Sequence, residues 1–350
     1  MQASSDRWPR VSVVMPVRNE GRYLARNLDA VLAQDYPPDR LEILVADGRS
    51  DDDTRDVIAR YVERAQREHG ATVVLVDNPE RVMPAGANAA IRRASGDLIL
   101  LLGGHASLPR DYVRACVECL ETSGADGAGG AIESVGEGWI GGAIAAAMSS
   151  PFGIGNSGFR TEGSGEPRLA DTLPFPLFRR SVYEKVGLYN PRMVRHQDYE
   201  FNYRVRAAGG RMMLLPGLRA TYHVRPSLTK LWRQYWQYGV WKGRFVRRHP
   251  QSLRVRHLAP SLFALAFVAL ALAAFAWPPA RVAFAVLAGA YLAFVLLGMA
   301  TFALRGRWGV VPLLPVVMVC LHFGYGLGVW AGLVQPPVPD APRPGAPSIA

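Results

Sequence analysis

Hydrophobic and polar positions follow two different patterns along the chain. Up to about residue 250, short apolar runs alternate with segments in which apolar residues recur at helical spacing. We predict strands over residues 11–17, 41–46, 72–76 and 98–102, and helices over 22–34, 53–67 and 86–95. Strands that alternate with helices predict an α/β fold with a mostly parallel sheet and right-handed crossovers.

From residue 258 the pattern changes to long stretches that carry almost no charge. Residues 258–277, 282–304 and 310–334 are each long enough to cross about 30 Å of hydrocarbon, so three transmembrane helices are expected. Arginines precede the first stretch and separate the second from the third, which predicts a cytosolic soluble part and an external C-terminus. The N-terminus has no apolar core of a secretory signal, and the proline-rich tail over 335–350 is expected to be disordered.

Net charge and cysteine content argue against some classes of protein. The formal net charge is +11, but many arginines lie next to the apolar stretches, and residues 1–150 show no evident cationic face. This placement favours an anionic membrane surface over nucleic acid. Three cysteines are too few for a disulfide framework, and the Cys116–Cys119 pair has no second pair that would complete a zinc site. Both features fit a reducing compartment.

Polar residues gather where the predicted strands end. Because ligands of parallel α/β sheets bind beyond the carboxyl ends of the strands, the loops over 16–20, 47–52 and 103–106 are the candidate binding loops. Gly153, Gly155 and Gly158 spell GxGxxG, but this motif neither follows the first strand nor opens a predicted helix. We therefore interpret it as a flexible loop and not as a dinucleotide site.

The run over 11–20 and the segment VADGRSDDDT over 45–54 resemble the family 2 glycosyltransferases, which have the GT-A fold. The resemblance implies that Pro16, Asn19, Glu20 and Asp47 contact the nucleotide of a sugar donor. A carboxylate suits that loop because it can accept a hydrogen bond from a base N–H. The alternative is that residues 50–53 simply cap the following helix.

The segment PAGANAAIRRASGD over 84–97 resembles the family stretch that places an asparagine near the nucleotide, which here is Asn88. The family then carries a DxD or Asp-x-His motif that holds Mg²⁺ or Mn²⁺ against the diphosphate. This chain has Gly103-Gly104-His105, so the first acidic ligand is missing and the expected divalent-cation site is weakened. His105 is the remaining candidate metal ligand, or it only bonds phosphate and arginines neutralise the charge.

Residues 171–189 and the segment HQDYEFNYR over 196–204 resemble the acceptor half of bacterial succinoglycan-type exopolysaccharide glycosyltransferases. Gln197 replaces the first acid of the family's Glu-Asp motif. The resemblance implies that Asp198 is the general base that removes the acceptor hydroxyl proton. Arg204 is a candidate substrate-binding residue, since an arginine can neutralise the charge of the diphosphate. A helix cap over 199–208 is the other interpretation of Asp198.

Together these features predict a GT-A, Rossmann-like catalytic domain followed by an all-α membrane region. The expected divisions are a cytosolic domain over 1–235, a basic and aromatic juxtamembrane segment over 236–257, three spans over 258–334 and the tail. The expected function is a membrane-anchored inverting hexosyltransferase. It would move sugar from a nucleotide-sugar donor, UDP-linked by expectation, to a lipid-linked or polysaccharide acceptor. The alternative is a catalytically inactive nucleotide-binding membrane protein that acts as an assembly partner, motivated by Gly103 and Gln197.

Overall fold

The structure is a computed structural model that describes residues 8–104, 106–155, 157–161 and 165–341. The chain forms two compact units. The first, here called the sheet unit, comprises Met1–Glu133, Glu162–Tyr222 and Pro339–Ala350. The second, here called the helical unit, comprises Ser134–Thr161 and His223–Val338. The predicted boundary at residue 235 therefore falls inside the helical unit, which also takes a segment from the middle of the chain.

The sheet unit alternates strands and helices in its first half, as the apolar runs predict. Its elements are β1 (Val11–Val17), α1 (Gly21–Leu32), η2 (Pro38–Arg40), β2 (Leu41–Asp47), α2 (Thr54–His69), β3 (Thr72–Asp77), α3 (Met83–Arg93), β4 (Leu98–Leu101), β5 (Ala106–Ser107), α4 (Tyr112–Ser123), β6 (Gly127–Val135), β7 (Arg168–Leu169), β8 (Leu177–Arg179), α8 (Arg180–Val186), α9 (Gln197–Ala207) and β9 (Met212–His223). The sheet order is β3-β2-β1-β4-β8-β6-β9-β5, and β7 pairs with β9. The first four strands are parallel, whereas β8 runs antiparallel to β4. The sheet is therefore mixed.

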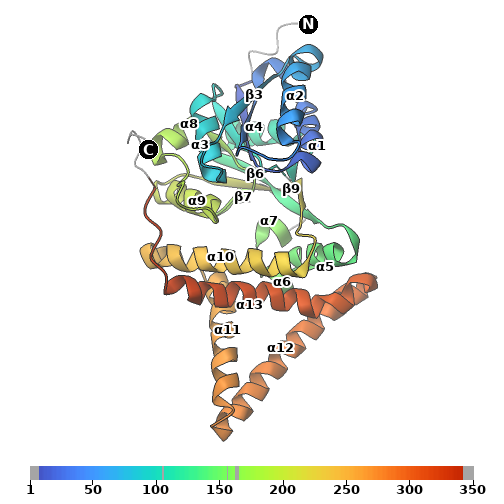
Figure 1. Cartoon of the computed structure of the whole chain (residues 1–350), viewed down its shortest axis with the longest axis vertical. Coiled ribbons are helices and arrows are strands. Elements are labelled where there is room, and N and C mark those ends of the chain that lie inside the picture. Colours follow the sequence, from blue (N-terminus) through green and yellow to red (C-terminus); the bar gives the residue numbers. More distant parts are fainter. Residues whose placement is uncertain (1–7, 105, 156, 162–164, 342–350) are drawn as a thin grey trace. The chain divides into compact units, whose positions relative to one another are not determined.

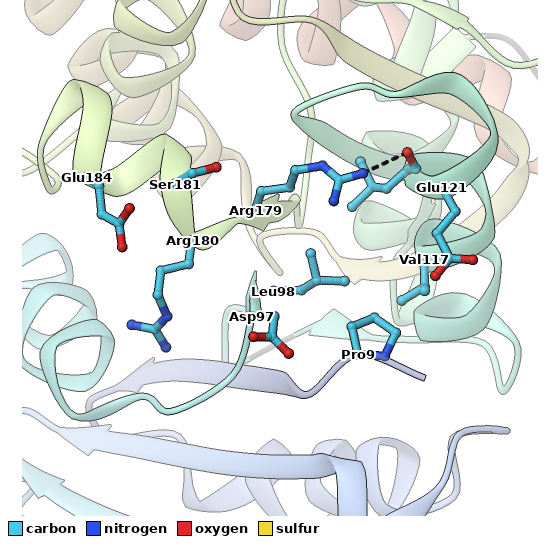
Figure 2. Close-up of a pocket in the computed structure, with 10 residues that line it drawn as sticks. Pro9, Asp97, Leu98, Val117, Glu121, Arg179, Arg180, Ser181 and Glu184 are labelled. Atoms are coloured by element: carbon cyan, nitrogen blue, oxygen red, sulfur yellow. Dashed lines mark hydrogen bonds between the residues drawn. The ribbon is translucent and has the colours of Figure 1, made fainter. Parts of the chain in front are cut away.

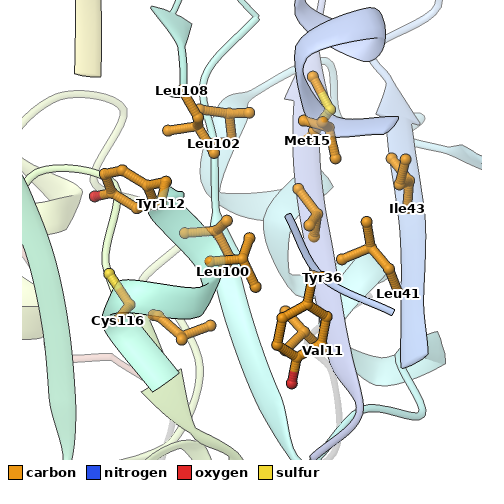
Figure 3. Packing of buried hydrophobic residues seen from close by; sticks show 14 of the residues in the cluster. Val11, Met15, Tyr36, Leu41, Ile43, Leu100, Leu102, Leu108, Tyr112 and Cys116 are labelled. Carbon is orange, nitrogen blue, oxygen red and sulfur yellow. The ribbon is translucent and has the colours of Figure 1, made fainter. Parts of the chain in front are cut away.

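The core of the sheet unit lies on both faces of the parallel strands. All seven residues of β1 and of β2 are buried, and the strands pair in register from Val11 with Leu41 to Val17 with Asp47. Figure 3 shows Met15, Ile43 and Leu100 packed in one layer between these strands and the flanking helices. Continuous apolar strands suit a parallel sheet that helices cover on both faces.

One carboxylate is buried at the start of these strands. Oε1 of Glu42 accepts hydrogen bonds from the Ser12 hydroxyl (2.5 Å) and from the backbone N–H groups of Ser95 (2.5 Å) and Gly96 (3.1 Å). Burial opposes the charge, but these hydrogen bonds hold the pKa of Glu42 below its ordinary value. The charged side chain thereby fastens the turn that leads into β4 to the neighbouring strands.

The helical unit contains α5 (Gly138–Met148), α6 (Pro151–Ile154), α7 (Gly158–Thr161), α10 (Leu228–Arg248), η3 (Pro250–Ser252), α11 (Val255–Ala273), α12 (Pro278–Leu304), η4 (Trp308–Leu313) and α13 (Leu314–Leu333). Within this unit α10 and α13 lie side by side, and α11 and α12 extend away from them and meet at a turn (Figure 1). The glycine motif that we expected to be a flexible loop forms the short helices α6 and α7 instead.

The described residues contain two helices that are long and apolar enough to cross a membrane by length and composition. They are Pro278–Leu304 and Trp308–Leu333, while the apolar part of α11, His257–Ala273, is shorter. The expectation of three spans is therefore met only in part. Helix α11 ends at Ala273, and residues 274–276 of the first predicted stretch form a turn.

Candidate active site

Asp47, the last residue of β2, is the most deeply buried acid of the candidate binding loops, at 1% exposure. Its carboxylate accepts hydrogen bonds from the Ser50 hydroxyl (2.5 Å) and the Ser50 backbone N–H (3.2 Å). Nε of Arg55 lies 3.3 Å from the same carboxylate and supplies a counter-charge. These contacts fix the orientation of the Asp47 side chain at the carboxyl edge of the sheet.

Ser50 also joins the loop after β2 to the loop after β1. Its hydroxyl oxygen accepts a hydrogen bond from the Asn19 backbone N–H (2.9 Å), and Oδ1 of Asn19 accepts one from the Asp51 backbone N–H (3.1 Å). Asn19 has a φ of 55°, a left-handed conformation that asparagine tolerates better than most residues. Ser50, which the sequence left as a candidate helix cap, thus positions two of the predicted binding residues.

Glu20 follows Asn19 and begins the step into α1. Its backbone N–H donates to the Thr54 hydroxyl (2.9 Å), which ties the first residues of α1 and α2 together. The predicted residue Pro16 lies in β1 with its strand neighbours and pairs in register with Ala46. The predicted residues Pro16, Asn19, Glu20 and Asp47 therefore share one edge of the sheet.

An exposed ion pair borders this edge and was not singled out from the sequence. Nη2 of Arg49 lies 3.1 Å from Oδ2 of Asp77, the last residue of β3. The hydrogen bond from Arg49 holds the pKa of Asp77 below its ordinary value. The signal that could have found Asp77 is its position, since it ends a strand as Asp47 does.

The loop after β4 carries the expected metal motif. His105, the predicted metal ligand, lies outside the described residues. A methyl group added to Gly104 would lie 2.8 Å from Cγ of Glu20, so the Glu20 side chain packs against this loop, whereas one added to Gly103 would meet open space. Across the described part of the chain no group of three or more His, Cys, Asp or Glu side chains could hold a metal ion.

Asp198, the predicted base, lies in the first turn of α9 and is exposed. The preceding residue, Gln197, places its Nε2 3.4 Å from Sδ of Met83, the first residue of α3. Because α3 follows β3, this contact brings the start of α9 to the region where the parallel strands end. Oδ1 of Asp198 accepts a hydrogen bond from the Tyr199 backbone N–H (2.9 Å).

Asn88 and Arg204, two predicted substrate-binding residues, make contacts inside the protein. The Asn88 amide donates to the carbonyl of Tyr189 (2.7 Å) and accepts from its backbone N–H (2.9 Å). Arg204 pairs with Glu200 at 2.6 Å and donates to the carbonyl of Leu188 (2.8 Å). Both side chains thus hold the segment between α8 and α9 in place, and their binding of substrate stays a prediction.

A separate cavity of about 380 Å³ lies where the parallel strands begin, away from these loops (Figure 2). It is lined by Asp97 at the start of β4 and by Arg179 and Arg180 at the junction of β8 and α8. The two guanidinium groups donate to backbone carbonyls, among them those of Leu120 and Ala94, at 2.8 Å each. This cavity gathers none of the predicted site residues.

The class of protein is indicated by the strand-end loops, the parallel half of the sheet and the acidic start of α9. The chain belongs to glycosyl transferase family 2, because the model of that family matches residues 12–187. The protein is therefore a glycosyltransferase, and its fold is the α/β, GT-A-like fold.

Similar proteins cover nearly the whole chain. The chain is 30% identical to the succinoglycan biosynthesis protein ExoA of Rhizobium meliloti (strain 1021), over 92% of this chain and 94% of that protein. It is 24% identical, over 93% and 97% of the two chains, to the dolichyl N-acetyl-alpha-D-glucosaminyl phosphate 3-beta-D-2,3-diacetamido-2,3-dideoxy-beta-D-glucuronosyltransferase of Methanococcus voltae. The mannosyltransferase PcManGT from Pyrobaculum calidifontis, solved in complex with GDP-Man and Mn2+, shares the fold with a TM-score of 0.56, 19% identity and coverage of 89% and 86%.

Proposed function

We propose that this protein is a membrane-associated, inverting glycosyltransferase that moves a sugar from a nucleotide-linked donor, UDP-linked by our expectation, to a lipid-linked or growing polysaccharide acceptor. The observation that supports the donor site is the convergence of Asn19, Ser50 and Asp47 at the ends of β1 and β2. The contacts with Ser50 and Arg55 hold the Asp47 carboxylate at the end of β2, and we assign to it the recognition of a base N–H.

The nature of the acceptor is inferred from two features. The names of two relatives refer to succinoglycan biosynthesis and to a dolichyl phosphate-linked sugar, which are a polysaccharide and a lipid carrier. The helical unit also carries two apolar helices of membrane-spanning length. An enzyme held at a membrane surface can reach an acceptor that is itself anchored in the bilayer, and we therefore favour attachment at the cytosolic face.

The mechanism uses Asp198 as general base. Its carboxylate removes the proton from the acceptor hydroxyl while that oxygen attacks the anomeric carbon, and the bond to the nucleotide diphosphate breaks on the opposite face. One displacement on the opposite face inverts the anomeric configuration. An exposed carboxylate in the first turn of α9 is accessible to an acceptor from solvent. Gln197 cannot share this role, because an amide does not accept a proton at neutral pH.

The described residues do not fit a tightly held divalent cation. Gly103 provides no ligand, the Glu20 side chain lies beside Gly104, and the described residues contain no group of three or more His, Cys, Asp or Glu side chains that could hold a metal ion. A cation bound with the diphosphate would neutralise charge on the leaving group. No step of the proposed mechanism depends on it.

The test is a donor-hydrolysis screen of the purified full-length protein across UDP-, GDP- and other nucleotide sugars, with and without Mn²⁺. We expect one nucleotide class to be hydrolysed and Asp47→Ala to lose donor binding. Asp77→Ala is the matched control, since Asp77 also ends a strand but is exposed. Equal loss in both variants would overturn the role of Asp47, and no hydrolysis of any donor would favour the inactive alternative.

A further inference from the structure

Helices α10 and α13 of the helical unit pack closely against each other, and this pair of helices is called the α10–α13 ribbon below. A methyl group added to Gly239 would lie 2.2 Å from the carbonyl oxygen of Tyr325, and one added to Gly243 would lie 2.2 Å from that of Val329. A step of four residues along α10, from Gly239 to Gly243, matches a step of four residues along α13, from Tyr325 to Val329. The residue numbers rise in the same direction, so the two helices run parallel. Their backbones touch because glycine leaves no side chain between them.

Both ends of this ribbon are connected to the sheet unit. The chain leaves the sheet unit after Tyr222 and enters α10 at Leu228. It leaves α13 at Leu333 and returns to the sheet unit at Pro339, whose carbonyl accepts a hydrogen bond from the buried side chain of Asn190 (2.7 Å). The returning segment passes the other end of α10, where Nε of Arg244 donates to the carbonyl of Pro336 (2.9 Å).

The two connections limit how the ribbon can lie. With 21 residues, α10 is about 31 Å long, which is the thickness of the hydrocarbon core. Each connection, over 223–227 or 334–338, reaches at most about 20 Å. If the ribbon crossed the bilayer, one of its ends would lie on the far side, and the chain could not return to a sheet unit on the near side. The number of crossings between Tyr222 and Pro339 must also be even.

The α10–α13 ribbon and the α11–α12 hairpin expose different kinds of side chain. The hairpin exposes large apolar side chains along its length: Leu262, Leu265, Val268, Leu272, Val282, Val286, Leu292, Leu296 and Leu297. By contrast α10 exposes Lys230, Arg233, Arg247 and Arg248, and α13 exposes few large apolar side chains. Arg305 and Arg307 lie where the hairpin rejoins the ribbon. Basic side chains at the junction of hairpin and ribbon can bind anionic lipid headgroups, and the apolar side chains of the hairpin can lie among lipid tails.

We propose that the α10–α13 ribbon is an interaction surface that lies along the cytosolic face of a phospholipid bilayer, and that only the α11–α12 hairpin crosses it. The proposal rests on the membrane attachment proposed above. It replaces the three expected spans by two: α11, whose 19 residues reach about 28 Å, crosses with α12, whereas α13 lies at the surface although it is also long and apolar enough to span. It places residues 339–341 on the same side as the active site. The ribbon thus holds the catalytic unit at the surface where a lipid-linked acceptor is embedded.

The proposal is tested by cysteine accessibility in intact cells that produce the full-length chain with Cys116, Cys119 and Cys320 replaced by alanine. Single cysteines are introduced by Ala276→Cys at the hairpin turn and by Ala341→Cys after the ribbon. With a membrane-impermeant thiol reagent we expect the cysteine at 276 to be labelled in intact cells, and the one at 341 only after permeabilisation. Labelling at 341 in intact cells would overturn the proposal, because α13 would then cross the bilayer.

Two other outcomes separate this proposal from the proposed function. If the protein sediments with membranes and neither position is labelled in intact cells, the hairpin does not cross and the proposal is wrong, although membrane attachment holds. If the protein stays in the soluble fraction, the membrane attachment itself is wrong.

A pair of charge substitutions gives a second readout of the same proposal. Leu292→Lys places a charge in the middle of α12, and Val319→Lys places one on the exposed side of α13. We expect at least a tenfold loss of membrane-integrated protein for Leu292→Lys and less than a twofold loss for Val319→Lys, because a lysine at the surface reaches water. Equal losses would contradict a ribbon that lies at the surface.

Discussion

The sheet unit is packed through large side chains, whereas the helical unit is packed in part through direct contact between helix backbones. In the sheet unit, large side chains such as Tyr112, Phe178 and Phe201 fill the space between the sheet and its helices. In the α10–α13 ribbon, glycines bring one helix backbone against the other. Side chains in the first kind of contact can repack around a small change, but a peptide backbone cannot move aside. The two units should therefore differ in the substitutions they tolerate, and the candidate catalytic residue Asp198 lies in the more tolerant sheet unit.

The largest effect should come from a change in the sheet unit that alters chemistry and not packing. Asp198→Asn should lower the rate of transfer by about 10²–10⁴-fold, the usual contribution of a general base, while donor affinity stays nearly unchanged. The measurement is initial rate of transfer together with nucleotide binding by calorimetry. Asp39→Asn, an exposed aspartate in the first turn of η2, is the control and should keep the wild-type rate. A near wild-type rate for Asp198→Asn would remove the base from the mechanism.

The next effect tests packing in the helical unit. Gly243→Ala puts a methyl group 2.2 Å from the Val329 carbonyl oxygen, so it should lower the free energy of unfolding by about 1–3 kcal/mol. Gly289→Ala on α12 is the matched control, because its methyl group meets no atom within 4 Å. The control should be neutral or stabilising by at most about 1 kcal/mol. Thermal unfolding in detergent measures both, and equal stability would show that the ribbon packs less closely than described.

A buried charge in the sheet unit gives a smaller and pH-dependent effect. Glu42→Gln should cost about 1–2 kcal/mol at neutral pH, because the hydrogen bonds from Ser12, Ser95 and Gly96 lose a charged acceptor. The folded state lowers the pKa of Glu42 from 4.5, so its stabilisation is present above that value and is lost as the pH falls through the lower pKa. The difference between wild type and variant should therefore shrink in acid. Thermal unfolding across pH 3–7 checks this, with the exposed Glu63→Gln as control.

The smallest effect concerns the loop after β4. Gly103→Asp restores a carboxylate at a position with open space and without a positive φ, so the fold should tolerate it and Mn²⁺ affinity should rise a few-fold. Gly104→Asp is the matched variant, and it should destabilise the loop because its Cβ meets the Glu20 side chain. Titration with Mn²⁺ followed by donor hydrolysis compares the two. An unchanged Mn²⁺ affinity in Gly103→Asp would show that residue 103 does not lie next to a bound cation.

The sequence predicted the parallel half of the sheet well, because each strand there is a continuous apolar run with a local signal. It also located the loops that hold Pro16, Asn19, Glu20 and Asp47, since strand ends follow directly from the strands. The antiparallel half was not assigned. Its strands β6 and β9 are nine and twelve residues long but contain glycine or proline, which weakens a strand pattern. The strands β7 and β8 are only two and three residues long and depend on their partners. Short strands carry no periodicity that a sequence pattern could reveal.

The contacts that the sequence did not predict join residues far apart in the chain. Asn88 and Tyr189 are 101 residues apart, and Asn190 meets Pro339 149 residues later. Arg204 was expected to bind substrate. Its ion pair with Glu200 is an i,i+4 contact that helical spacing could have indicated, whereas its hydrogen bond to the Leu188 carbonyl, 16 residues away, has no local signal. The residue types in these contacts are ordinary polar ones, so only the fold reveals them.

The helical unit also has a consequence for the order in which the protein is made. It takes residues 134–161 from the middle of the chain, and Trp139 of α5 donates a hydrogen bond to the carbonyl of Gly309, 170 residues later. At a synthesis rate of about 5–20 residues per second, α5 must wait about 10–30 s for that partner to leave the ribosome. During this interval α5 has α6 beside it but lacks its neighbours in η4 and α13. The packing of α5 is therefore completed only after η4 and α13 have been synthesised.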